Sequence, residues 1–275
     1  MVLLALKLLL SPALVLIAWW LGRRFGPAIG GRAAALPIVA GPIMLVLALT
    51  QGIAFASQTA KYALLGITPL SAFGVAYSWI ARNRLRSDAS RFTQATAGLL
   101  LGWLVFLGVA TGFDRACHRT TPSQLPLALC AVAAAFTLWL FPRLVAKAPD
   151  DLQPLRAHDV RKEIGGRILG AMLLVGTLTT VAARLGPAWS GLLASFPVAF
   201  SVVLVASHLC DGADTVRPVV CGYLAGLWGY LVFLVLFSWL LPSLGLAATL
   251  LISWPAAPLV QWGHHRWRRG TAGQK

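Results

Sequence analysis

The chain has 275 residues, of which 58% are hydrophobic and only 11% are charged, and its formal net charge is +15. Soluble domains carry about 25% charged residues, so this composition excludes an ordinary soluble fold and indicates a membrane protein. Basic residues gather in short loops between apolar runs, a pattern typical of topology determinants, and this argues against nucleic acid as a partner.

Apolar runs long enough to cross a bilayer, about 20 residues each, recur along the whole chain. The first is interpreted as a retained span, because Trp19 and Trp20 stand where a leader peptide would be cleaved. A polar stretch over residues 143–166 is predicted to be a cytoplasmic linker. The sequence predicts about nine spans: 3–21, 33–56, 62–81, 92–111, 125–142, 167–184, 188–208, 219–241 and 244–262.

The basic residues are distributed unevenly between the two sides of these spans. Eighteen of the 23 fall on one side, and the remaining five are Lys7, Lys61, Arg115, Arg119 and Arg184. The positive-inside rule places the richer side in the cytoplasm. We therefore predict a bacterial inner-membrane protein with a periplasmic N-terminus and a cytoplasmic C-terminus.

The two halves of the chain contain similar segments. GGRAAALPIVAGPIMLVLALTQG follows the first span and AWSGLLASFPVAFSVVLVASHLCDG follows the sixth, which aligns Pro42 with Pro197. If each half holds four spans, a single connector helix inverts the second half, as in many transporters. The predicted fold is all-α, with two inverted four-helix repeats. Its boundaries are 1–122 for the first repeat, 123–163 for the connector and linker, and 164–275 for the second repeat with a basic tail.

The second of these segments also resembles a known family. GPAWSGLLASFPVAFSVVLVASH, followed by GYLVFLVLFSW, is similar to the GlpM-like family of small four-span bacterial inner-membrane proteins, whose second span carries a comparable small-Leu-x-x-x-Phe-Pro pattern. The close part covers residues 165–262, and the first half is more distant, with Gly41-Pro42 in place of Phe196-Pro197. The family has no settled activity, so the resemblance implies a tandem duplication of its fold and no particular function.

Catalytic and metal-binding signatures are not found in the sequence. None of the eight carboxylates falls in the middle of a predicted span, which weakens a proton- or cation-coupled mechanism. Neither zinc-protease nor nucleotide-binding motifs occur, and the histidines and cysteines do not cluster at metal-ligand spacing. We predict a protein that is not an enzyme, with no cofactor and no metal.

The two aligned prolines are the best indication of a functional site. A proline inside a helix removes one hydrogen bond, which would free carbonyls near residues 38 and 193. Matching interruptions in two repeats point to a solute site at the middle of the membrane, and plain structural kinks are the alternative. The candidate solute-binding residues are Gly41, Pro42, Thr50, Gln51, Lys61, Ser195, Pro197, Ser201 and His208.

Together these features predict a small-solute transporter or permease. The alternative is a non-catalytic accessory subunit of an envelope membrane complex. An enzyme acting on a lipid-linked substrate is less favoured, because no acid, base or metal set accompanies the loop arginines. The expected partners are the lipid bilayer and an unidentified small solute, and a homo-oligomer is left open.

Overall fold

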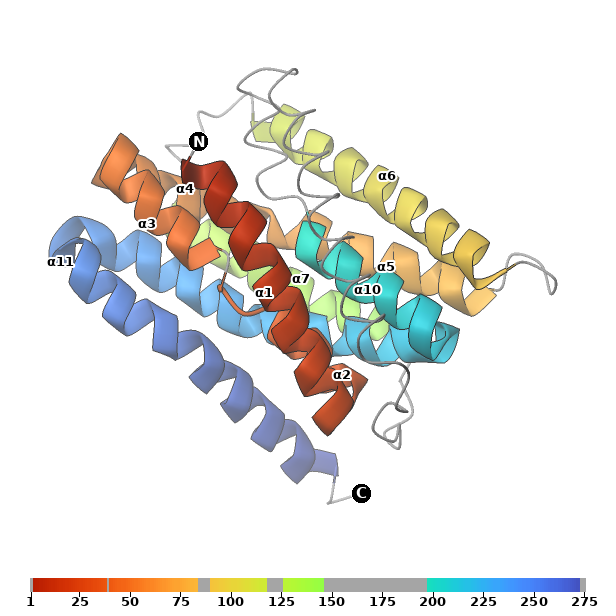
Figure 1. The fold of residues 1–275 in the computed structure, drawn as a ribbon. Helices are drawn as coiled ribbons and strands as arrows, with labels where there is room; N and C mark the ends of the chain where they lie inside the picture. The colour runs from red at the N-terminus through yellow and green to blue at the C-terminus, as the bar shows by residue number, and fades with distance from the viewer. Residues whose placement is uncertain (1, 39, 84–89, 118–125, 146–196, 273–275) are drawn as a thin grey trace.

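The computed structural model describes residues 2–38, 40–83, 90–117, 126–145 and 197–272. In these residues every regular element is a helix, which confirms the all-α prediction for them, and the helices pack side by side as an elongated bundle (Figure 1). Four helical stretches are long and apolar enough to cross a membrane, as expected of a membrane protein. They are Ile53–Asn83, Arg91–Phe113, Leu127–Leu144 and Ala213–His264.

The chain opens with α1 (Val2–Phe25), which turns at Gly26 into the antiparallel α2 (Pro27–Ala34). Helix α3 (Ala40–Gln51) then follows a non-helical step at residues 35–38. The span predicted over 33–56 is therefore wrong as a single helix. Pro37 disfavours the α conformation of its neighbour, and Gly52, with φ of 92°, ends α3.

Helices α4 (Ile53–Leu65) and α5 (Ile67–Asn83) form one long pass, because Gly66 between them keeps a helical φ of −64°. The span predicted to start at residue 62 thus starts nine residues earlier. Helix α6 (Arg91–Cys117) returns antiparallel to α5, with Gly98 against Tyr77 and Gly102 against Phe73. Helix α7 (Leu127–Leu144) packs on the other side of α5.

The last described part contains α10 (Val198–Asp211), the 3₁₀ turn η2 (Ala213–Thr215) and α11 (Val216–Ala272). Helix α11 is two arms, 216–244 and 246–272, because Gly245 has a φ of 73°. The arms are antiparallel: Gly229 lies against Ala257, and Gln261 Nε2 donates to the Gly226 carbonyl at 2.9 Å (Figure 1). The predicted spans 219–241 and 244–262 fall on these two arms.

Parts of the predicted arrangement lie outside the described residues. The span predicted at 167–184, most of the linker at 143–166 and the first part of the span at 188–208 are among them. The count of nine spans therefore stays a prediction.

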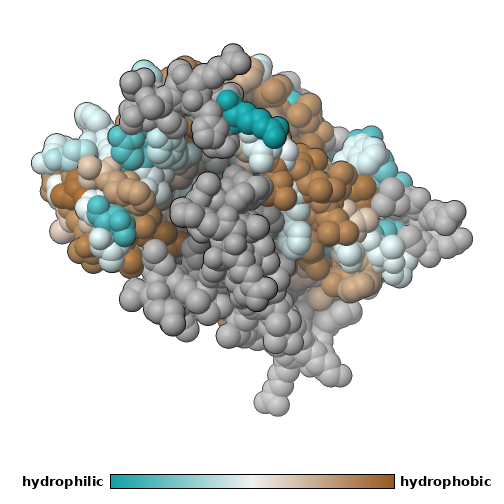
Figure 2. All heavy atoms as spheres, turned by 90° about the horizontal axis from the view of Figure 1, so that it is seen from above, coloured by the Kyte–Doolittle hydropathy of each residue, from teal (hydrophilic) through white to brown (hydrophobic). Residues whose placement is uncertain are grey.

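The bundle is apolar outside as well as inside. Large apolar side chains are exposed on α6, α7 and the second arm of α11, and brown apolar residues cover much of the described surface in Figure 2. Inside, glycines bring backbones together: a Cβ at Gly222 would collide with the Ala28 carbonyl, and one at Gly226 would crowd Arg32. Such close helix contacts through small residues are typical of membrane bundles.

Candidate functional site

Helix α10 carries the most polar part of the described interior. It begins at Pro197, whose φ of −77° and ψ of 54° are not helical, and it ends at Gly212, with φ of 96°. Thr215 secures the end of the helix, because its Oγ1 donates to the Ser207 and Gly212 carbonyls. These boundaries fix how far α10 extends into the core and which of its side chains face α5 and α6.

His208 is fully buried and touches Tyr77 of α5. The Tyr77 hydroxyl lies 3.2 Å from His208 Nδ1, the rings meet edge to face with centroids 5.9 Å apart, and both residues are 0% exposed. The other imidazole nitrogen, Nε2, has no hydrogen-bond partner among the described residues. A buried polar atom left without a partner costs about 1–3 kcal/mol, so this nitrogen is an available hydrogen-bonding position in an apolar interior.

A second polar contact lies two turns away on the same face of α10. Ser201 is seven residues before His208, which places both side chains on one side of the helix. The indole Nε1 of Trp103, on α6, donates to Ser201 Oγ at 3.2 Å. Ser201 is also almost completely buried. Helix α10 therefore presents two hydrogen-bonding groups to the α5–α6 pair.

Aromatic rings surround these polar groups. Phe200 stacks on Tyr223 of α11 with centroids 3.5 Å apart and planes 7° apart, and it meets Phe73 of α5 edge to face. Gly74 leaves room for the Phe200 ring, because a Cβ at this position would lie only 3.3 Å from the ring. We call the whole group the His208 cluster: Phe73, Tyr77, Trp103, Phe200, Ser201, His208 and Tyr223.

The prolines act differently from the prediction. Pro42 is the third residue of α3 and Pro197 immediately precedes α10, so each stands at a helix start and neither kinks a continuous helix. The first turn of a helix has no internal partner for its N–H groups, so a proline there removes nothing. The Pro37 carbonyl accepts the Gly41 N–H at 2.9 Å. This bond does not involve the carbonyl of residue 38, and residue 193 lies outside the described residues. The free carbonyls near residues 38 and 193 stay predictions.

The other predicted site residues are dispersed. Gly41 is buried against the Trp254 indole of the second arm of α11. Thr50 and Gln51 are exposed at the end of α3, and Thr50 Oγ1 donates to the Val46 carbonyl of its own helix. Lys61 is half-buried on α4. Ser195 lies outside the described residues. Of the predicted set, only Ser201 and His208 belong to the His208 cluster.

Sequence reasoning missed Tyr77 and Trp103, which complete the cluster. A pattern of small residues at Ser71, Gly74 and Ser78 was the available signal, because small residues let neighbouring helices approach α5 closely. It indicates a packed face and does not identify the helix that packs there. The partner helix lies 131 residues away in the chain.

Two cavities stand out in the described part of the chain, and neither is a large polar chamber. A hollow of about 10 Å³ lies beside Ser207, between α10 and the Gly22–Gly30 contact. A groove of about 330 Å³ with an apolar lining opens at the surface of α5, α6 and α7. Within the described ranges, His, Cys, Asp and Glu side chains form no group of three that could hold a metal ion.

No known protein family, curated protein or solved structure matches this chain.

Proposed function

We propose that the protein is a membrane transporter for a small polar solute and that the His208 cluster contributes to the solute's path. The carrying observation is His208 itself, which is 0% exposed and has an imidazole nitrogen without a described partner. Buried ionisable residues in membrane helices are costly and tend to mark transport pathways. Hydrogen-bond donors and acceptors from Ser201, Tyr77 and His208 suit a neutral polar solute or an anion.

We further propose that the two halves are inverted four-helix repeats related to the GlpM-like fold, with boundaries at 1–122, 123–163 and 164–275. Three features support this. Helices α3 and α10 run in opposite directions in Figure 1. Both start at a proline-bearing turn and end at a glycine with φ of 92° or 96°. Each glycine leads into a long apolar pass.

The bundle has one basic end, which we propose faces the cytoplasm of a bacterial inner membrane. The last turns of α1, α5 and α7 carry Arg23 and Arg24, Arg82, and Arg143, and α6 begins at Arg91. In Figure 1 these helix ends point to the same end of the bundle. Several of the arginines lie over aromatic rings, as Arg143 lies over Trp139 at 3.7 Å, an arrangement suited to a membrane interface.

Transport is tested by solute flux into proteoliposomes that contain the purified protein, using panels of neutral polar solutes and small anions. We expect one solute class to be taken up above empty liposomes and His208→Ala to reduce that uptake at least ten-fold. The matched control is His264→Ala, which removes an imidazole outside the cluster. Both variants must elute as folded protein in detergent. Equal flux in wild type and His208→Ala would remove His208 from the solute path.

A second function, an accessory subunit of an envelope complex, is favoured by one observation. The two cavities described above are an apolar surface groove and a hollow of about 10 Å³, and neither is a polar chamber of solute size. This function predicts no flux for any solute in either panel, together with co-purification of a larger membrane assembly from mild detergent. Uptake by the isolated protein excludes it as the sole role.

A further inference from the structure

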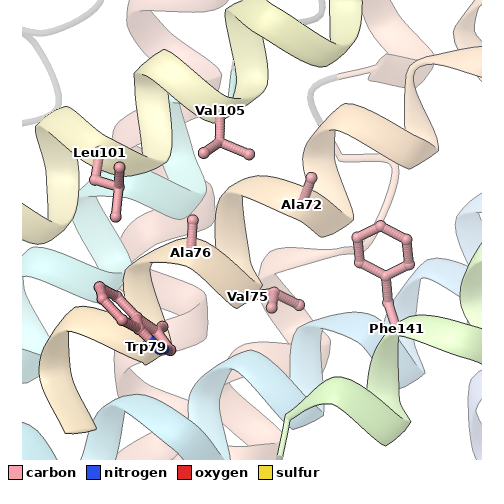
Figure 3. A pocket seen from close by; sticks show the side chains of 7 residues that line it. All are labelled: Ala72, Val75, Ala76, Trp79, Leu101, Val105 and Phe141. Carbon is pink, nitrogen blue, oxygen red and sulfur yellow. The ribbon is translucent and has the colours of Figure 1, made fainter. Parts of the chain in front are cut away.

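The groove between α5, α6 and α7 is the larger of the two cavities described above and is separate from the His208 cluster. Its floor is formed by α5, and its walls come from α6 and α7 (Figure 3). The volume of about 330 Å³ is at the lower end of the range for small-ligand pockets, about 300–1,000 Å³. The lining residues are Ala72, Val75, Ala76, Trp79, Leu101, Val105 and Phe141.

The shape of the groove fits a hydrocarbon chain better than another helix. Ala72 and Ala76 make a shallow floor, while Leu101, Val105 and Phe141 stand as bulky walls (Figure 3). Ala72 and Ala76 are four residues apart, a spacing at which a transmembrane helix can approach, but bulky side chains of α6 and α7 stand on either side of them. An acyl chain is narrower than a helix and can lie between bulky walls.

Charge at one end of the groove identifies the headgroup. Arg82 is one turn beyond Trp79 on α5, and Arg91 begins α6, which runs antiparallel to α5 and so starts at that same end. Both arginines are exposed. In the described parts of the three lining helices, the one carboxylate belongs to Asp114, near the opposite end of α6. Arg143 is turned over Trp139 and does not contribute.

We propose that this groove binds one anionic phospholipid, with an acyl chain between α6 and α7 and the phosphate near Arg82 and Arg91. Basic residues close to an anionic headgroup each raise its affinity by a factor of about five. A zwitterionic phospholipid has the same chains and lacks the net charge, so it occupies the groove more weakly. The proposal does not depend on transport.

Native mass spectrometry of the purified full chain, titrated with phosphatidylglycerol or phosphatidylcholine of identical chains, tests the headgroup. We expect the first phosphatidylglycerol to bind at least ten-fold more tightly than phosphatidylcholine. The double variant Arg82→Gln/Arg91→Gln should lose most of this preference. The control Arg115→Gln removes an exposed charge from the other end of α6 and should keep it. Equal affinity for both lipids, or equal losses in both variants, overturns the proposal.

Photo-crosslinking tests the groove itself. Phosphatidylglycerol with a diazirine on its acyl chain should label peptides of α5, α6 and α7 that contain the groove lining. Ala76→Leu fills the floor and should reduce labelling at least three-fold, while Ala128→Leu, an exposed site at the start of α7, should leave it unchanged. Phe141→Ala provides a second lining variant if Ala76→Leu does not fold. Labelling confined to other helices, or displaced by a co-purifying membrane protein, overturns the assignment of a lipid.

Discussion

Individual side chains in this protein matter most where a polar group is buried between helices. The Tyr77 hydroxyl satisfies one nitrogen of His208, and neither residue is exposed. An interhelical hydrogen bond in a membrane protein contributes about 0.6 kcal/mol on average. Loss of this one leaves a buried nitrogen without its partner, so the higher cost of about 1–3 kcal/mol is the relevant scale.

Tyr77→Phe should therefore lower the free energy of unfolding by about 1 kcal/mol. The measurement is unfolding in mixed micelles, followed by tryptophan fluorescence. Tyr230→Phe is the control, because it removes the same hydroxyl from a half-buried ring that stacks on Phe233. If the control loses as much stability as Tyr77→Phe, the contact with His208 is not the cause.

A reciprocal pair of serines joins α4 to the first arm of α11. Ser57 Oγ donates to the Ser238 carbonyl at 2.8 Å, and Ser238 Oγ donates to the Ser57 carbonyl at 3.1 Å. Because each hydroxyl bonds the other residue's backbone, removing one leaves the second bond in place. The loss of one bond nevertheless weakens the helix contact that holds the other, and residues in contact usually couple by about 0.5–3 kcal/mol.

Ser57→Ala and Ser238→Ala should each cost about 0.6 kcal/mol, and the double variant should differ from their sum by about 0.5 kcal/mol or more. The same unfolding assay applied to all four proteins gives the double-mutant cycle. A coupling energy near zero would mean that each bond is made or lost without affecting the other, which contradicts the prediction.

Among the elements, four helix boundaries are marked by glycines with positive φ. Gly26, Gly52, Gly212 and Gly245 have φ between 73° and 97° and ψ near 160–180°. This region of backbone space is essentially restricted to glycine. Each of these glycines reverses or redirects the chain between two apolar helices, so the order of the bundle depends on them.

Gly212→Ala should destabilise the protein by about 1–3 kcal/mol, because alanine is strained in that conformation even though no atom lies within 4 Å of the new Cβ. The thermal midpoint in detergent measures this loss. Gly263→Ala also meets open space but lies inside a helix, so it should stabilise by up to about 1 kcal/mol. Opposite signs for these two substitutions are the expected result, and equal signs contradict the argument.

At the scale of the whole molecule, the basic residues gather at the end of the bundle where several helices finish. The basic ends of α1, α5 and α7 point to one end of the bundle, where α11 also finishes (Figure 1). Arg266, near the end of α11, lies over Trp262 at 4.2 Å. The described part of the bundle thus has one strongly basic end, which faces the cytoplasm in the proposed orientation.

Reporter fusions test this orientation. A fluorescent protein fused after Lys275 should fluoresce, and an alkaline phosphatase fused after residue 122 should be active, because the first requires the cytoplasm and the second the periplasm. Exchanging the two reporters should abolish both signals. Phosphatase activity at the C-terminus would falsify the orientation.

The sequence by itself predicted apolar helices that could span a membrane, the all-α class of the described residues and the gathering of basic residues on one side. These predictions depend only on local composition, because the length of an apolar run and the charge of a loop do not depend on how the helices pack. The resemblance to the GlpM-like family and the count of nine spans remain predictions. Pro37 indicated in the sequence that the helix breaks after α2. The turn at Gly52 could not be predicted, because the neighbouring residues do not determine the φ of a glycine.

Only the tertiary structure decided which polar groups meet. Sequence singled out Ser201 and His208 on α10, and it also grouped them with Thr50 and Gln51, which are exposed at the end of α3. Tyr77 becomes the partner of His208 because its long side chain reaches from α5 to α10, beside the Phe200 ring that lies against Gly74. Helix periodicity tells which residues share a face, whereas the partner of that face is chosen by packing between distant segments.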